Sequence, residues 1–163
     1  MLNARPLTVF ALDGRIAVHY RDHTTLANLH WRHDAVSDTL TLSTPLGQTV
    51  AVLTRDSQGV TLTDNRQHIH SAPTMEDLTG QMLGWRLPLQ NLAYWIVGSA
   101  MPDLPYRLQT EPATGALQLI QSDWLITYKR WTALAGTELP ANLTVSGQDM
   151  TVRLVVSNWR MAQ

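Results

Sequence analysis

A mostly alternating pattern of apolar and polar residues runs from residue 7 to residue 70 of this 163-residue chain and limits what it can fold into. A period of two is typical of strands with one buried face, and turn-forming residues separate the successive segments. The apolar positions are Ile16, Val18, Tyr20, Ala27, Leu29, Trp31, Leu40, Leu42, Val50, Val52, Val60 and Leu62. The expected breaks lie at Asp13 and Gly14, Arg21 and Asp22, His33 and Asp34, 45–47, 57–59, and Asp64 and Asn65. The pattern predicts an antiparallel meander.

After Ser71 the period changes to that of two short helices. Thr74, with Asp77 three residues later, resembles a capping box, and Gly84 is a plausible end for the first helix. Its apolar face carries Met75, Leu78 and Met82. The second helix is expected from Pro88 to Gly98. One of its faces carries Leu89, Leu92, Ala93 and Ile96, and the other carries Tyr94, Trp95 and Val97, so we expect it to be covered all round.

Strand patterning resumes after a proline-rich connection and continues from Leu117 to near Trp159. Strands, two helices and further strands predict an α+β fold dominated by one antiparallel sheet of about eleven strands. Such a sheet is too large to stay flat, so we expect it to curl into a barrel or half-barrel. The helices would bury their apolar faces against its concave side. Nothing along the chain indicates a linker, so residues 1–163 are expected to form a single domain.

The composition excludes several classes of protein. A net charge of -1 provides no basic surface for nucleic acid, and the lack of cysteine excludes disulfides, cysteine-ligated zinc and thiol nucleophiles. The uncharged segment 87–102 is too short and too often interrupted to be a membrane span, so the chain is expected to be soluble. Only 15% of the residues are charged and six are tryptophan, which suggests a large apolar interior.

Residue patterns for catalysis or metal binding are weak. His30 and His33 would lie on opposite faces of a strand, whereas His68 and His70 share a face but lack a third ligand. No nucleophile motif, phosphate-binding loop or dinucleotide fingerprint occurs. We therefore predict no metal, no cofactor and no enzymatic activity. A lipid-modifying enzyme stays open as a third hypothesis, to be revived by turnover of an acyl ester.

Leu46 is an unusual residue for the tip of a hairpin. It lies between Pro45 and Gly47, where its own two strands cannot bury it. A single exposed leucine can be a chance occurrence. Otherwise it contacts something apolar, such as a partner, a second copy or a lipid. Full insertion of one leucine contributes about 1.5–3 kcal/mol, which is a contact and not an anchor.

Five motifs in order give the chain a family resemblance. They are DGRIAV, LTLSTPLGQTVAVL, MLGWRLPLQNLAYWIVG, GALQLIQSDWLITY with Gln121, Trp124 and Tyr128, and LPANLTV followed by SNW. The chain resembles the outer-membrane lipoprotein receptor family LolB from about Gly14 to Trp159. The resemblance implies an incomplete antiparallel β-barrel with short helices as a lid over an apolar cavity.

The resemblance also implies a function. LolB-like proteins accept acylated lipoproteins from the periplasmic carrier LolA and insert them into the outer membrane without ATP. Leu46 corresponds to the protruding apolar residue of the family, with Pro45 and Gly47 completing the transfer loop that meets outer-membrane lipid. We expect a monomer acting at the periplasmic face of the outer membrane. Family members are normally anchored through an acylated cysteine, and this chain contains no cysteine, so we expect an anchor only in the natural protein.

A set of apolar residues is expected to contact the acyl chains. From the sheet these are Ile16, Val18, Leu29, Trp31, Leu40, Leu42, Val50 and Val52, and from the helices Met75, Leu78, Met82, Leu92 and Ile96. The alternative is a lipocalin-like carrier of small hydrophobic ligands that never delivers to a membrane. Transfer of an acyl-peptide to vesicles distinguishes the two.

Overall fold

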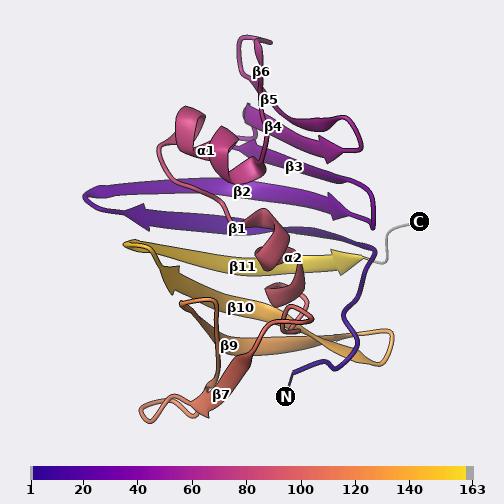
Figure 1. Cartoon of the computed structure of the whole chain (residues 1–163), viewed down its shortest axis with the longest axis vertical. Coiled ribbons are helices and arrows are strands. Elements are labelled where there is room, and N and C mark those ends of the chain that lie inside the picture. The colour runs from indigo at the N-terminus through magenta and orange to yellow at the C-terminus, as the bar shows by residue number, and fades with distance from the viewer. Residues whose placement is uncertain (1, 161–163) are drawn as a thin grey trace. The chain divides into compact units, whose positions relative to one another are not determined.

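The computed structural model describes residues 2–160, which form one antiparallel sheet of eleven strands and two short helices (Figure 1). The strand order is β6-β5-β4-β3-β2-β1-β11-β10-β9-β8-β7, so β6 and β7 are its edges and the sheet is not closed. The predicted α+β fold with about eleven strands is confirmed. The strands are β1 Phe10–Tyr20, β2 His23–His33, β3 Asp38–Ser43, β4 Thr49–Asp56, β5 Gly59–Asp64, β6 Ile69–Ala72, β7 Tyr106–Thr110, β8 Leu117–Gln121, β9 Trp124–Leu134, β10 Thr137–Gly147 and β11 Met150–Arg160.

The chain divides into two compact units. Unit 1 comprises Met1–Leu7, Ile16–Thr25 and Gln90–Val156. Unit 2 comprises Thr8–Arg15, Leu26–Leu89 and Ser157–Gln163. Each unit has its own buried apolar side chains, and each is described below by itself.

Unit 2 carries helix α1, Met75–Leu83, packed against β5 and β6. The Thr74 hydroxyl accepts a hydrogen bond of 3.1 Å from the Asp77 amide, and Gly84 adopts the left-handed conformation that ends the helix. The predicted start and end are therefore confirmed. The buried face of the unit 2 sheet carries Leu29, Trp31, Leu40, Leu42, Ala51, Leu53, Val60 and Leu62.

The prediction for Val50 and Val52 is wrong about the face they occupy. Leu40 pairs with Leu53 and Leu42 with Ala51, so alanine and leucine are the buried residues of β4. Val52 pairs with Thr41 on the opposite face, and Val50 is the extra residue at a bulge and is 41% exposed. The run Val50–Leu53 is apolar throughout, so alternation alone cannot fix its phase.

Unit 1 carries helix α2, Leu89–Trp95, from Gln90 onward. The predicted end at Gly98 is confirmed by a two-bond cap: the Ser99 amide donates to the Tyr94 carbonyl, and the Gly98 amide to the Trp95 carbonyl, each over 3.0 Å. Gly98 has a φ of +78°, and a Cβ there would come within 2.7 Å of the Trp131 ring. The expectation that α2 is covered all round is wrong, because Gln90 is exposed.

Several strand boundaries differ from those predicted. Asp13 and Gly14 do not break β1, which runs through them. Strand β6 extends two residues beyond the predicted strand region, which ends at residue 70. Strand β7 is not predicted: it lies within the proline-rich connection, and all five of its residues are exposed, so it shows no burial period. Neither helix within residues 2–160 is long and apolar enough to cross a membrane, and the uncharged segment 87–102 forms α2 and the turn after it.

Candidate functional site

The loop that carries Leu46, residues 44–48, is a hydrogen-bonded turn. The Thr44 amide donates to the Gln48 carbonyl and the Gly47 amide donates to the Thr44 carbonyl, each over 2.8 Å. Gly47 has a φ of +89°, a conformation that a residue with a side chain rarely adopts. The Asn28 side-chain amide also donates to the Thr44 carbonyl, over 3.3 Å. The turn is therefore tied to β2 as well as to its own two strands.

Leu46 is 91% exposed at the tip of this turn. Its flanking residues Pro45 and Gly47 are exposed too. Its exposure is the largest among the exposed large apolar side chains of residues 2–160. The turn holds the backbone in place while the side chain faces solvent, which is the arrangement that a contact with an external apolar phase requires.

The other predicted site residues fall into two sets. In unit 2, Leu29, Trp31, Leu40, Leu42, Met75 and Leu78 are buried, whereas Met82 at the end of α1 is exposed. Pairing places Trp31 beside Leu40 and Leu29 beside Leu42. In unit 1, Ile16, Val18, Leu92 and Ile96 are buried.

A buried polar cluster in unit 2 was not anticipated from the sequence. The carboxylate of Asp38 accepts hydrogen bonds from the Trp31 indole at 2.8 Å and from Arg55 Nε at 2.7 Å, and His33 Nδ1 lies 2.6 Å from it. The Phe10 ring stacks on His33 with centroids 4.9 Å apart. Strand pairing places His33 beside Asp38 and Asp38 beside Arg55, so only the register reveals the cluster. It joins β2, β3 and β4 through a compensated buried charge.

Three further histidines, His30, His68 and His70, lie near carboxylates. His30 contacts Asp13, and Arg160 lies 3.2 Å from the same carboxylate. In the turn 64–68, His70 lies 3.1 Å from Asp64. The hydrogen bond with His70 and the backbone hydrogen bond from His68 lower the pKa of Asp64 from 3.8 to about 2. Among residues 2–160, three or more potential ligands never gather into a metal-binding group.

A hollow of about 560 Å³ lies beside the hairpin of β4 and β5. Its lining includes the hydroxyls of Thr54, Thr61 and Ser71 and the carboxylate of Asp56. A lining with these polar groups does not suit an acyl chain. The hollow is therefore not the site predicted from the sequence.

Comparison with protein families gives a match over nearly the whole chain. The model described as "Outer membrane lipoprotein LolB" matches residues 8–159. The protein named outer-membrane lipoprotein LolB of Nitrosomonas europaea is 35% identical over 153 residues, covering 93% of this chain and 72% of that protein. Its namesake from Chromobacterium violaceum is 34% identical, covering 93% of this chain and 80% of that protein.

Solved structures share the fold at low sequence identity. A putative outer membrane lipoprotein-sorting protein domain from Vibrio parahaemolyticus superimposes with a TM-score of 0.57 at 9% identity, covering 94% of this chain and 85% of that one. A LolA superfamily protein from Nitrosomonas europaea gives a TM-score of 0.54 at 10% identity, covering 98% of this chain and 88% of that one. At such identities the likeness establishes the fold alone.

Proposed function

The chain belongs to the LolB family, and from this premise we propose that it accepts acylated lipoproteins from a LolA-like periplasmic carrier and inserts them into the outer membrane without ATP. Its relatives are named outer-membrane lipoproteins, which supports action at the periplasmic face of that membrane. Residues 1–163 would act as one functional domain and as a monomer. The observation that carries the membrane step is Leu46, 91% exposed on a hydrogen-bonded turn.

The energetics of acyl chains explain why such a protein is needed. Each CH₂ moved from water into an apolar environment contributes about 0.8 kcal/mol, so exposing one long chain to water costs on the order of 10 kcal/mol. Uncatalysed transfer through water would be very slow. Without nucleotide hydrolysis, direction comes from successively better apolar sites, in the order carrier, receptor and bilayer. No bond is made or broken, so the proposal requires no catalytic group.

The acyl-binding surface is proposed to include the buried apolar residues of unit 2. Leu29, Leu40 and Leu42 lie on the buried face of the sheet, and Met75 and Leu78 are buried residues of α1. These side chains are already buried, so an acyl chain reaches them only if the residues that cover them move. Methionine suits such a site because its side chain adapts to flexible ligands. Val50 and Val52 are left out because they do not lie on this face.

The proposed test measures the rate at which the Leu46→Glu variant releases a bound fluorescent acyl-peptide into liposomes. We expect the variant to fold and to bind the acyl-peptide normally, while release slows about tenfold or more because the inserted leucine is lost. Val36→Glu is the matched control, since Val36 is 68% exposed in the turn after β2. Release by Leu46→Glu at the normal rate would show that the tip has no role in delivery.

The family match does not favour a lipocalin-like carrier without membrane delivery. The same assay separates the two functions, because such a carrier binds the acyl-peptide without releasing it to vesicles.

A further inference from the structure

Two turns of unit 2 have the same backbone geometry. In the turn 44–48, the amide of the first residue, Thr44, donates to the carbonyl of the fifth, Gln48. The amide of the fourth residue, Gly47, donates to the Thr44 carbonyl. In the turn 64–68, Asp64 donates to His68 over 3.0 Å and Gln67 donates to Asp64 over 3.1 Å. The fourth residues, Gly47 and Gln67, both have positive φ, +89° and +66°. In both turns the first side chain also accepts a hydrogen bond from the fifth amide, at 3.3 Å and 2.9 Å.

The two turns lie at the same end of the strands. The turn 44–48 leads into the start of β4, and the turn 64–68 follows the end of β5. Strands β4 and β5 are antiparallel neighbours, with Ala51 paired to Asp64. The centres of the two turns are separated by two strand spacings, roughly 10 Å.

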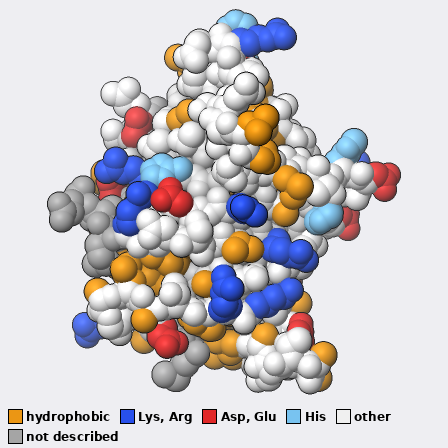
Figure 2. All heavy atoms as spheres, turned by 180° about the vertical axis from the view of Figure 1, so that it is seen from behind, with side chains coloured by type: hydrophobic (Ala, Val, Ile, Leu, Met, Phe, Trp, Pro, Cys, Tyr) orange, Lys and Arg blue, Asp and Glu red, His pale blue; other side chains and the backbone are white. Residues whose placement is uncertain are grey.

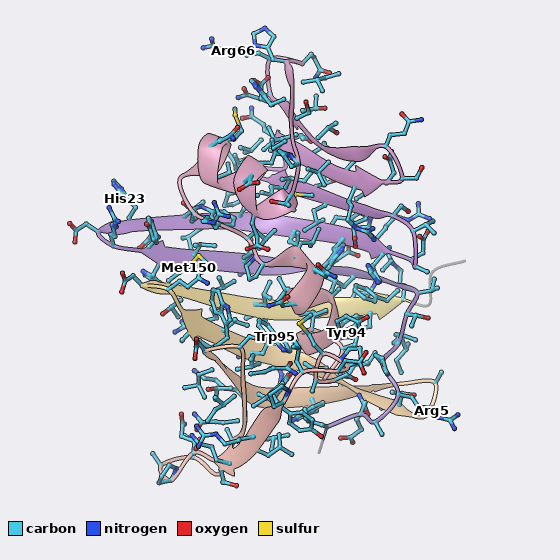
Figure 3. All side chains as sticks on the ribbon, in the orientation of Figure 1. Arg5, His23, Arg66, Tyr94, Trp95 and Met150 are labelled. Atoms are coloured by element: carbon cyan, nitrogen blue, oxygen red, sulfur yellow. The ribbon has the colours of Figure 1, made fainter. Side chains whose placement is uncertain are left out.

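Leu46 and Arg66 hold equivalent third positions in these turns, so one tip is apolar and the other cationic. Arg66 is exposed, and its guanidinium has no hydrogen-bond or ion-pair partner within residues 2–160 (Figure 3). The neighbouring carboxylate of Asp64 accepts hydrogen bonds from the Arg66 and His68 backbone amides and contacts His70. The positive charge of Arg66 is therefore available to an external anion.

Apolar side chains are also exposed around the two tips. Ile69, directly after the second turn, is 71% exposed. It pairs with Thr63, which in turn pairs with Val52, so these three residues form one row across β4, β5 and β6. Leu26 is 66% exposed on β2, two residues before Asn28, whose side chain binds the first turn. Figure 2 views the face of this unit opposite its helix and shows hydrophobic side chains over these strands, with basic and histidine side chains at the top.

We propose that the two turns, together with Leu26 and Ile69, form one phospholipid-binding surface, which rests on the proposed membrane delivery. Leu46 and Ile69 enter the boundary of the acyl region, and the Arg66 guanidinium binds headgroup phosphates. The lipid bilayer is the occupant that the chemistry fits: apolar side chains flanked by an unpaired cation favour an interface with an apolar interior and anionic headgroups.

The test is flotation of the full chain with vesicles of phosphatidylethanolamine and phosphatidylglycerol. Arg66→Glu should weaken binding about fivefold or more at low salt, and less at high salt, because one cation contributes roughly this factor at an anionic surface. Ile69→Glu should weaken binding at both salt concentrations. Arg32→Glu and Val36→Glu are the controls, because both residues are exposed near the opposite end of β2.

The outcomes separate this proposal from the proposed function. If Leu46→Glu alone among the three variants weakens vesicle binding, the turn 64–68 has no role and the proposal is overturned. If Arg66→Glu and Ile69→Glu weaken binding while Leu46→Glu does not, the two turns do not form one surface and the proposal is overturned, whereas the delivery role of Leu46 is decided separately by the release assay. Normal flotation of all three, with loss of binding to a LolA-like carrier, would make the surface a protein interface and overturn the proposal.

Discussion

The two helices are held to their sheets by different forces. In unit 1, the Tyr128 hydroxyl donates to the Trp95 carbonyl over 2.7 Å, and the Trp95 indole donates to Gln121 over 2.9 Å. Trp95 is the last residue of α2 (Figure 3). Both bonds are buried, and burial raises the pKa of Tyr128, so its hydroxyl stays a donor. These bonds require one fixed position of the helix.

In unit 2, α1 rests mainly on apolar side chains. Met75 and Leu78 pack inward, and the Thr79 hydroxyl accepts one hydrogen bond of 2.8 Å from the Leu87 amide. The ion pair of Asp77 and Arg86, at 3.2 Å, is exposed and contributes little. Apolar contacts are non-directional, so α1 can shift onto an apolar ligand more easily than α2 can. We therefore expect α1, and not α2, to move when acyl chains enter.

The largest effect is expected from removing the indole ring of Trp95, which holds the end of α2 to Gln121. Trp95→Ala should lower the free energy of unfolding by about 3–5 kcal/mol, because it empties a fully buried site. Urea denaturation measures the loss, and hydrogen exchange should show α2 amides opening without global unfolding. A loss below 1 kcal/mol would mean that α2 is not held at this point, and the contrast between the helices would disappear.

The buried polar cluster within unit 2 tests how much a compensated charge stabilises the sheet of that unit. Arg55→Ala should destabilise by about 2–3 kcal/mol, because it removes a charged hydrogen bond from buried Asp38 while Arg55 itself is partly exposed. Arg55→Ala with Asp38→Asn should recover part of this loss, since the uncompensated charge is then gone. Additive losses in the double variant would show that the pair is not coupled.

A matched pair of hydroxyl deletions compares the helices directly. Tyr128→Phe leaves the Trp95 carbonyl without this donor and should cost about 2 kcal/mol, with faster amide exchange in α2 only. Thr79→Val should cost about 1 kcal/mol and speed both α1 exchange and acyl-peptide uptake. If Tyr128→Phe speeds uptake and Thr79→Val does not, α2 is the helix that moves.

The smallest effect concerns the turn 64–68. The folded pKa of Asp64 is lowered from 3.8 to about 2, so the ionised carboxylate stabilises the turn above pH 4. That contribution is lost as the pH falls from about 4 to 2, because protonation then removes the pairing with His70. Urea titrations of Asp64→Asn across this range should show a weaker pH dependence than the parent. An identical dependence in both would locate the acid sensitivity elsewhere.

Prediction from the sequence succeeded where a local pattern decides the structure. The capping residues Thr74 and Gly84 mark the ends of α1, and Gly98 ends the turn after α2, because caps depend on a few neighbouring residues. It failed at Val50 and Val52, where an apolar run has no readable phase. It also missed the edge strand β7, since five exposed residues carry no burial period.

The sequence by itself determined most of the strands, both helices and the apolar tip at Leu46, because alternation, caps and turn residues act over a few positions. Tertiary pairing alone decided which residues share a face or a cluster. His33, Asp38 and Arg55 become neighbours, and the turns of Leu46 and Arg66 come to the same end, only when β2 to β6 are set in register. The physical reason is that register depends on contacts between distant segments, each of which is compatible with several alignments until all are buried together.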